Sequence, residues 1–73
     1  MQMQTVTSSN IAAIGHNADT STLRITFNSG TSYDYQNIPE SLFRELLVAE
    51  SVGSFFTRNI KSQPEVYPYT KVS

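Results

Sequence analysis

His16 is the only histidine in the chain, and its imidazole could act as a general base or as one ligand of a metal ion. A metal site would need further ligands, such as Asp19 and Asp34 from separate elements, and no motif spacing supports one. The chain has no cysteine, which excludes a thiol nucleophile and a cysteine-based metal site. We therefore interpret His16 as a polar residue that closes a strand, and we expect no metal site and no cofactor.

Serine is the other potential nucleophile, but no serine lies in the Gly-x-Ser-x-Gly pattern of a nucleophile elbow. Three glycines, far apart, leave no phosphate-binding loop. A single domain of 73 residues also has little volume for a walled pocket once its core is filled. We expect no catalytic residues and a protein that is not an enzyme.

Tyr33 and Tyr35 form a Tyr-x-Tyr pattern, which places both rings on one face of a strand. Two interpretations remain open. On an exposed face, the rings could stack on RNA bases, with Arg58 and Lys61 contacting phosphates. Under a layer of helices, they would belong to the core with their hydroxyl groups at its rim. We favour core packing because Arg24 is the only basic residue on these strands.

Charge is distributed unevenly along the chain, which has a formal net charge of −1. Residues 1–53 carry net −3, whereas residues 54–73 carry net +2. The cationic and aromatic residues of this basic-aromatic end are Arg58, Lys61, Tyr67, Tyr69 and Lys71. They could contact an acidic protein surface or RNA; alternatively, the cations stabilise a helix C-terminus and the tyrosines hold the tail in place. Nucleic-acid affinity from three cations would be weak and salt-sensitive.

The order of the elements follows from hydrophobic periodicity. Residues 22–28 alternate between apolar and polar and predict a strand, with residues 11–16 and 31–36 as its antiparallel neighbours across short turns. Two later segments have the spacing of amphipathic helices, with apolar residues Leu42, Phe43, Leu46 and Leu47 in the first and Val52, Phe55, Phe56 and Ile60 in the second.

These elements predict an α+β fold: a three-stranded antiparallel β-meander followed by two short α-helices packed on one face, in the order β-β-β-α-α, with flexible termini. We divide the chain into a flexible N-terminal arm (1–7), a domain (8–62) and an extended C-terminal tail (63–73). Apolar runs are far shorter than the roughly 18 residues that span a bilayer, so we expect no membrane contact. We also expect a monomer, and the lack of cysteine and of a signal-peptide pattern favours the cytoplasm.

Thr5, Val6 and Thr7 of the arm suggest a further contact. If the first strand lies at the sheet edge, either this arm or an incoming peptide could pair with it. Strand addition provides affinity through backbone hydrogen bonds with little demand on side chains. The alternative is that the arm only covers the edge against aggregation.

An ordered set of short motifs resembles the KTSC domain family over about residues 8–72. The set comprises Ser8-Ser9-Asn10-Ile11, Ile14-Gly15, Leu23-x-Ile25-x-Phe27, Gly30-x-x-Tyr33-x-Tyr35, Ile38-Pro39, Ala49-x-Ser51-x-Gly53, Phe56, Ile60 and Tyr67-Pro68-Tyr69. His16 departs from the family, which often has an aromatic residue there. The family has no settled activity, and RNA binding is a suggestion attached to it.

A stand-alone chain of this length and pattern is also similar to small phage regulators of transcription that inhibit the host RNA polymerase. This resemblance implies binding to the polymerase β and β′ subunits in the bacterial cytoplasm, loss of σ-dependent initiation and an influence on termination. The contacts we predict for this partner are Thr5, Val6, Thr7, Arg58, Lys61, Tyr67, Tyr69 and Lys71. A small RNA-binding module that uses Tyr33, Tyr35, Arg58 and Lys61 is the alternative.

Overall fold

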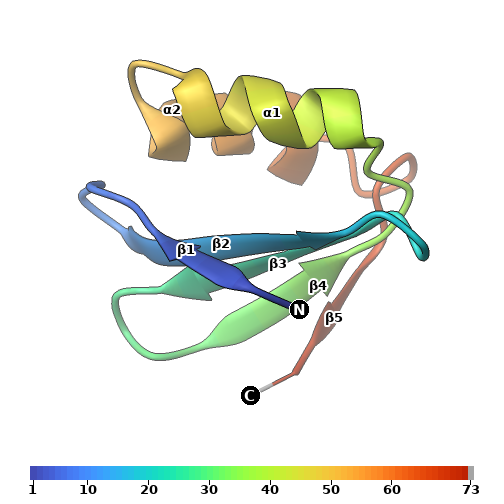
Figure 1. Ribbon diagram of the computed structural model, residues 1–73, viewed down its shortest axis with the longest axis horizontal. Coiled ribbons are helices and arrows are strands. Elements are labelled where there is room, and N and C mark those ends of the chain that lie inside the picture. The colour runs from blue at the N-terminus through green and yellow to red at the C-terminus, as the bar shows by residue number, and fades with distance from the viewer. Residues whose placement is uncertain (73) are drawn as a thin grey trace.

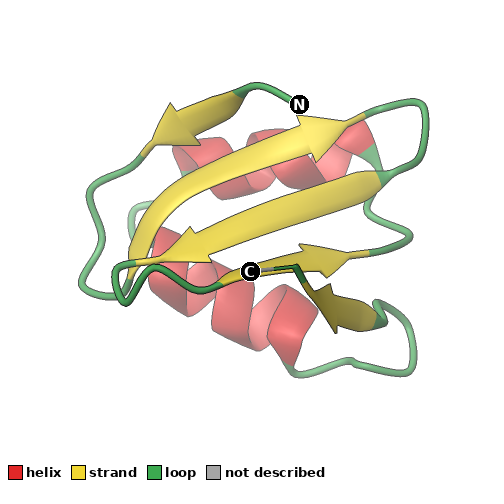
Figure 2. Ribbon diagram, turned by 90° about the horizontal axis from the view of Figure 1, so that it is seen from below, coloured by secondary structure: helices red, strands yellow, loops and turns green. Residues whose placement is uncertain are grey.

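The computed structural model describes residues 1–72 and has two layers, a curved antiparallel sheet and a layer of helices on one of its faces (Figure 1). The strands are β1 (Met3–Thr5), β2 (Ile11–Asn17), β3 (Thr22–Phe27), β4 (Ser32–Tyr35) and β5 (Tyr69–Lys71). The helices are α1 (Glu40–Val48), α2 (Val52–Phe56) and the π-helix η1 (Thr57–Lys61), which continues directly from α2. Figure 2 shows all the helices behind the sheet, with the other sheet face open.

The sheet has five strands in the order β1-β2-β3-β4-β5, so the prediction of three strands was wrong. The predicted meander corresponds to β2, β3 and β4. Both segments that we expected to be flexible contribute an edge strand: the arm supplies β1, which pairs with β2, and the tail supplies β5, which pairs with β4. A sheet edge exposes unpaired backbone groups, and these two segments cover both edges of the meander.

The register places one apolar face of the sheet against the helices. Leu23 lies opposite Tyr35, and Ile25 lies opposite Tyr33. A register shift between Ile11 and Ala13 marks a β-bulge in β2. The bulge explains why residues 11–16 lack clean alternation, since an extra residue changes which side chains face the core.

The core lies between the sheet and the helices. Its buried apolar side chains are Ile11, Ile14, Leu23, Ile25, Tyr35, Ile38, Phe43, Leu46, Val52, Phe56 and Ile60. Phe56 makes edge contacts with two rings of the sheet, Tyr35 at 5.1 Å and Phe27 at 6.0 Å between ring centroids. These edge-to-face pairs join the helix layer to β3 and β4.

The starts of α1 and α2 are marked by residues that suit helix N-termini. Ser51 caps α2, because its Oγ accepts a hydrogen bond from the Ser54 N–H at 3.2 Å. Pro39 precedes α1 as its N-cap residue, with Glu40 in the first turn. No helix in residues 1–72 has the length and apolar character needed to cross a membrane.

Tyr35 is the one buried tyrosine, with 4% of its surface exposed. Burial, together with the neighbouring Tyr69 and Tyr33 phenols, raises the pKa of Tyr35 to about 12. The phenol therefore stays protonated in the folded protein at pH values where a solvated tyrosine ionises.

We expect Phe56→Ala to lower the free energy of unfolding by about 3–5 kcal/mol, because it removes a fully buried ring and leaves a cavity. Phe55→Ala is the matched control, since Phe55 is only partly buried and should cost clearly less. Urea unfolding followed by circular dichroism measures both values. Equal losses for the two variants would contradict the described core.

Stability should fall as the pH rises from 10 towards 12. Over that range the unfolded chain releases the Tyr35 proton, whose ordinary pKa is 10.0, while the folded chain retains it. The slope approaches ~1.4 kcal/mol per pH unit, and it is absent below pH ~10. Tyr35→Phe removes this contribution, so urea unfolding at several alkaline pH values should show a flatter profile for the variant. Parallel profiles would exclude a raised pKa.

Candidate functional site

A small cavity with aromatic walls lies between the β4–β5 side of the sheet and the end of the helix layer. Its volume is about 270 Å³. We call it the aromatic cavity; it is lined by Phe27, Tyr33, Tyr35, Lys61, Pro64 and Tyr69. It combines residues that are far apart in the sequence, since β5 lies beside β4 and Lys61 ends η1.

Strand register brings the tyrosines together. Tyr69 of β5 lies opposite Tyr35 of β4, and Lys71 lies opposite Tyr33. Residues directly opposite each other in a ladder share a face, so all four side chains lie on the helix side of the sheet. The Tyr69 ring is 5.5 Å from the Tyr35 ring and 5.8 Å from the Tyr33 ring.

Exposure differs sharply among these tyrosines. Tyr35 is buried, Tyr33 is half-buried, and Tyr69 is 56% exposed. The cavity therefore has an inner wall fixed by the core and an outer wall that an incoming group could contact. Lys61 at its rim and Lys71 beside Tyr33 make this region positive, and Glu65, which follows Pro64, offsets one of the two charges.

The residues predicted to bind RNA are only partly brought together. Tyr33, Tyr35 and Lys61 line the aromatic cavity, but Arg58 lies elsewhere. Tyr33 and Tyr35 face the helices and not the open face of the sheet. On that open face, Arg24 and Asp34 form an ion pair across β3 and β4 at 2.7 Å.

The residues predicted to contact a protein partner are divided between the two sheet edges. Thr5 pairs with Ala13 at the β1 edge, whereas Tyr69 and Lys71 lie at the β5 edge. Val6 packs against the core, and its N–H donates to the Ala12 carbonyl at 3.1 Å. The arm therefore covers the edge of β2 and does not adjoin the basic-aromatic end.

Tyr67 is half-buried and packs against the core. The tail around it is held by two hydrogen bonds, from the Asn37 amide to the Val66 carbonyl at 3.2 Å and from the Gln36 N–H to the Pro68 carbonyl at 2.9 Å. Tyr67 thus anchors the tail that carries β5.

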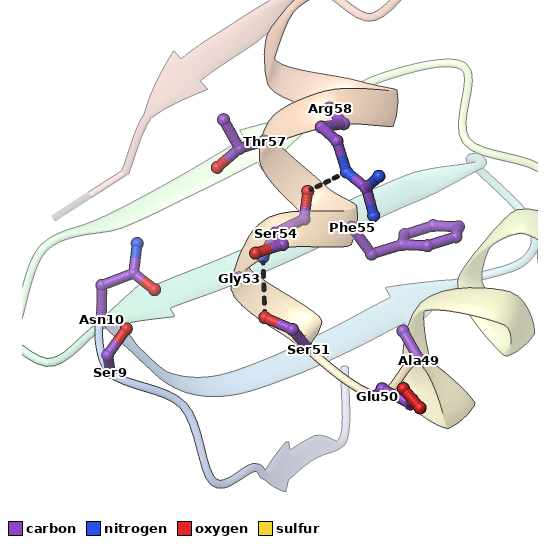
Figure 3. A pocket seen from close by; sticks show the side chains of 10 residues that line it. All are labelled: Ser9, Asn10, Ala49, Glu50, Ser51, Gly53, Ser54, Phe55, Thr57 and Arg58. Atoms are coloured by element: carbon purple, nitrogen blue, oxygen red, sulfur yellow. Dashed lines mark hydrogen bonds between the residues drawn. The ribbon is translucent and has the colours of Figure 1, made fainter.

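A second, larger cavity of about 860 Å³ opens between the β1–β2 loop and the start of α2 (Figure 3). We call it the serine-lined cavity, because Ser9, Ser51 and Ser54 line it. Arg58 also lines it, and its Nε donates to the Ser54 carbonyl at 3.4 Å. Arg58 is therefore separated from Lys61 of the aromatic cavity.

Two signature motifs of the resemblance meet beside this second cavity. A Cβ atom on Gly53 would lie 2.7 Å from Asn10 Oδ1 and 3.2 Å from Ser8 Oγ, so the glycine permits close packing of the β1–β2 loop on α2. Within that loop, Ser8 Oγ accepts a bond from the Ile11 N–H at 3.4 Å. The close approach of the loop to α2 explains the glycine in one motif, and the turn hydrogen bond explains the serine in the other.

The His16 side chain contacts the Ile38 carbonyl and the Phe43 ring. Its Nε2 lies 2.7 Å from the Ile38 carbonyl oxygen, which can only accept, so this nitrogen carries the proton. The ring stacks on Phe43 with centroids 5.0 Å apart. Within residues 1–72, no group of three or more His, Asp or Glu side chains is placed to hold a metal ion.

Sequence reasoning did not assign Phe27 and Pro64 to a site. Phe27 belongs to the alternating pattern of residues 22–28, and Pro64 lies in the predicted C-terminal tail. No local signal links them, because their proximity depends on the return of the tail to β4.

The comparisons with known proteins agree with this architecture. A model of the KTSC domain matches residues 7–63. A crystal structure of a KTSC domain protein from Yersinia pestis superimposes with a TM-score of 0.90 at 33% identity, covering 99% of this chain and 97% of that one.

Two sequence relatives come from bacteria other than Yersinia pestis. A protein of Tsukamurella paurometabola is 39% identical over 59 residues, which cover 81% of this chain and 88% of the relative. An uncharacterised protein of Stutzerimonas stutzeri is 29% identical over 72 residues, 99% of both chains. On the family match and this coverage, the chain belongs to the KTSC domain family.

Proposed function

We propose that this chain is a non-enzymatic, protein-binding regulator that contacts its partner through the aromatic cavity and the lysines beside it. The observation that carries the proposal is Tyr69, which leaves more than half of its surface exposed above a cavity with a positive rim. Tyrosines in such positions are frequent anchors of protein interfaces, since they supply contact area at a low entropic cost.

The size and charge of the cavity favour a side chain of a partner over a free metabolite. Its volume of about 270 Å³ lies below the roughly 300–1,000 Å³ typical of drug-sized ligands. Lys61 and Lys71 would attract an acidic surface and steer the encounter. These two lysines suit a protein patch better than a long phosphate backbone, which needs more cations for tight binding.

The partner in this proposal is bacterial RNA polymerase. We choose this partner because of the resemblance to small phage regulators of transcription, which implies contacts with the β and β′ subunits. Loss of σ-dependent initiation is the expected outcome, with an effect on termination as a second one. Occupying a polymerase surface needs no catalytic group, only a stable contact patch.

RNA binding is the second candidate, supported by the position of Lys61 in the same cavity as Tyr33 and Tyr69. A base could stack on the exposed Tyr69 ring while Lys61 contacts a phosphate. The platform is small, because Tyr35 is buried and the open sheet face presents the Arg24–Asp34 ion pair.

Immobilised protein should retain the polymerase β and β′ subunits from a bacterial lysate, and Tyr69→Ala or Lys61→Glu should reduce their recovery by about tenfold or more. Arg44→Glu is the matched charge-reversal control, because the Arg44 side chain is exposed on α1 and pairs only weakly with Glu40. Recovery of no polymerase subunit by the parent chain would refute the proposed partner.

If RNA is the ligand, titration with mixed-sequence single-stranded RNA at low salt should show binding whose strength falls steeply as salt rises. Lys61→Glu and Tyr69→Ala should both abolish the signal, and Arg58→Glu should leave it unchanged because Arg58 lies at the other cavity. Fluorescence anisotropy measures these affinities. A flat titration of the parent chain would reject this candidate.

A further inference from the structure

Within residues 1–72, β5 ends the sheet order, so the backbone groups on its outer edge have no neighbouring strand to pair with (Figure 1). The Val72 N–H donates to the Ser32 carbonyl at 2.9 Å, and the Pro68 carbonyl accepts from the Gln36 N–H at 2.9 Å. Backbone groups in an antiparallel pair point towards the partner at every second residue. The N–H and carbonyl groups of Thr70 therefore also point to β4, whereas those of Tyr69 and Lys71 point outwards.

Tyr69 and Lys71 also have their side chains on the face of the sheet that carries the aromatic cavity. Tyr69 lines the cavity, and Lys71 lies opposite Tyr33, which also lines it. A strand added to β5 would thus place every second side chain beside Tyr69 and Lys71, at the cavity mouth. The edge supplies hydrogen bonds, and the cavity and lysines supply a means of selection.

We propose, on the basis of the protein-binding function above, that an extended acidic segment of the partner protein adds to β5 as a sixth strand. The segment runs antiparallel to β5. One of its carboxylates lies beside Lys71, and two residues further on an aromatic or apolar side chain enters the aromatic cavity beside Tyr69. This binding mode needs no rearrangement of the core.

Charge complementarity selects this occupant. Lys61 and Lys71 outnumber Glu65 at this edge, so a carboxylate on the added strand gains an opposite-charge neighbour. A second copy of the chain would bring the same lysines and be repelled. The β1 edge offers no such selection, since Met3, Gln4 and Thr5 carry no charge and line neither cavity.

The test is an NMR titration of the ¹⁵N-labelled full chain with the peptide acetyl-Thr-Glu-Thr-Phe-Thr-amide. The amide signals of Tyr69 and Lys71 should shift and become protected from exchange. Replacing Glu by Lys should weaken binding about fivefold, because it places like charges opposite each other. Methylating the Phe nitrogen should also weaken it about fivefold, because it removes a backbone donor that faces β5.

Equal affinity of the three peptides would overturn the proposal, and so would shifts confined to the serine-lined cavity. The proposal would also be overturned if the amide signals of Tyr69 and Lys71 changed with protein concentration in the absence of peptide. Such changes would show that β5 pairs with a second copy of the chain.

Two variants separate this binding mode from the choice of partner. Lys71→Ala removes the charge, whereas Lys71→Pro also removes an outward N–H and leaves the Thr70 and Val72 bonds to β4 in place. Polymerase recovery should fall with Lys71→Ala and fall further with Lys71→Pro. If both variants recover polymerase like the parent, strand addition is wrong and the proposed function stands. If the parent recovers no polymerase but discriminates among the peptides, strand addition stands and the partner is wrong.

Discussion

The pairing of β5 with β4 is the interaction on which the candidate site depends. It places Tyr69 against Tyr35 and Lys71 against Tyr33, and so converts a polar tail into one wall of the aromatic cavity. Without this pairing, β4 would form the sheet edge and Tyr35 would lose its contact with the Tyr69 ring. The tail is directed to β4 by the Asn37 and Gln36 hydrogen bonds and by the packing of Tyr67.

Patterns that reflect burial predicted the centre of the fold correctly. The strands β2 to β4 and the helix layer follow from alternation and helical spacing, because each has one face in the core. The edge strands β1 and β5 have three residues each, mostly exposed, so no burial pattern marks them. Their pairing depends on backbone N–H and carbonyl groups. Every residue except proline has both groups, so the residue types do not reveal which segments pair.

The candidate site could be predicted only in part, because it depends on the pairing of an edge strand that no burial pattern marks. The sequence places Lys61 and Tyr69 in the basic-aromatic end of five residues, and Tyr33 and Tyr35 as a pair on one strand face. That these two pairs meet in one cavity depends on strand order. Arg58, three residues from Lys61, points to a different cavity, since the helix turns the two side chains towards different neighbours. The signature glycine Gly53 is explained by the close β1–β2 loop.

Amide hydrogen exchange of the free chain tests the β4–β5 pairing most directly. The described register predicts slow exchange for the amides of Thr70 and Val72, which point to β4, and fast exchange for those of Tyr69 and Lys71, which point outwards. This alternation, measured residue by residue by NMR, would support the account. Uniformly fast exchange from Tyr69 to Val72 would contradict it, because the tail would then be unpaired and the aromatic cavity would lack its outer wall.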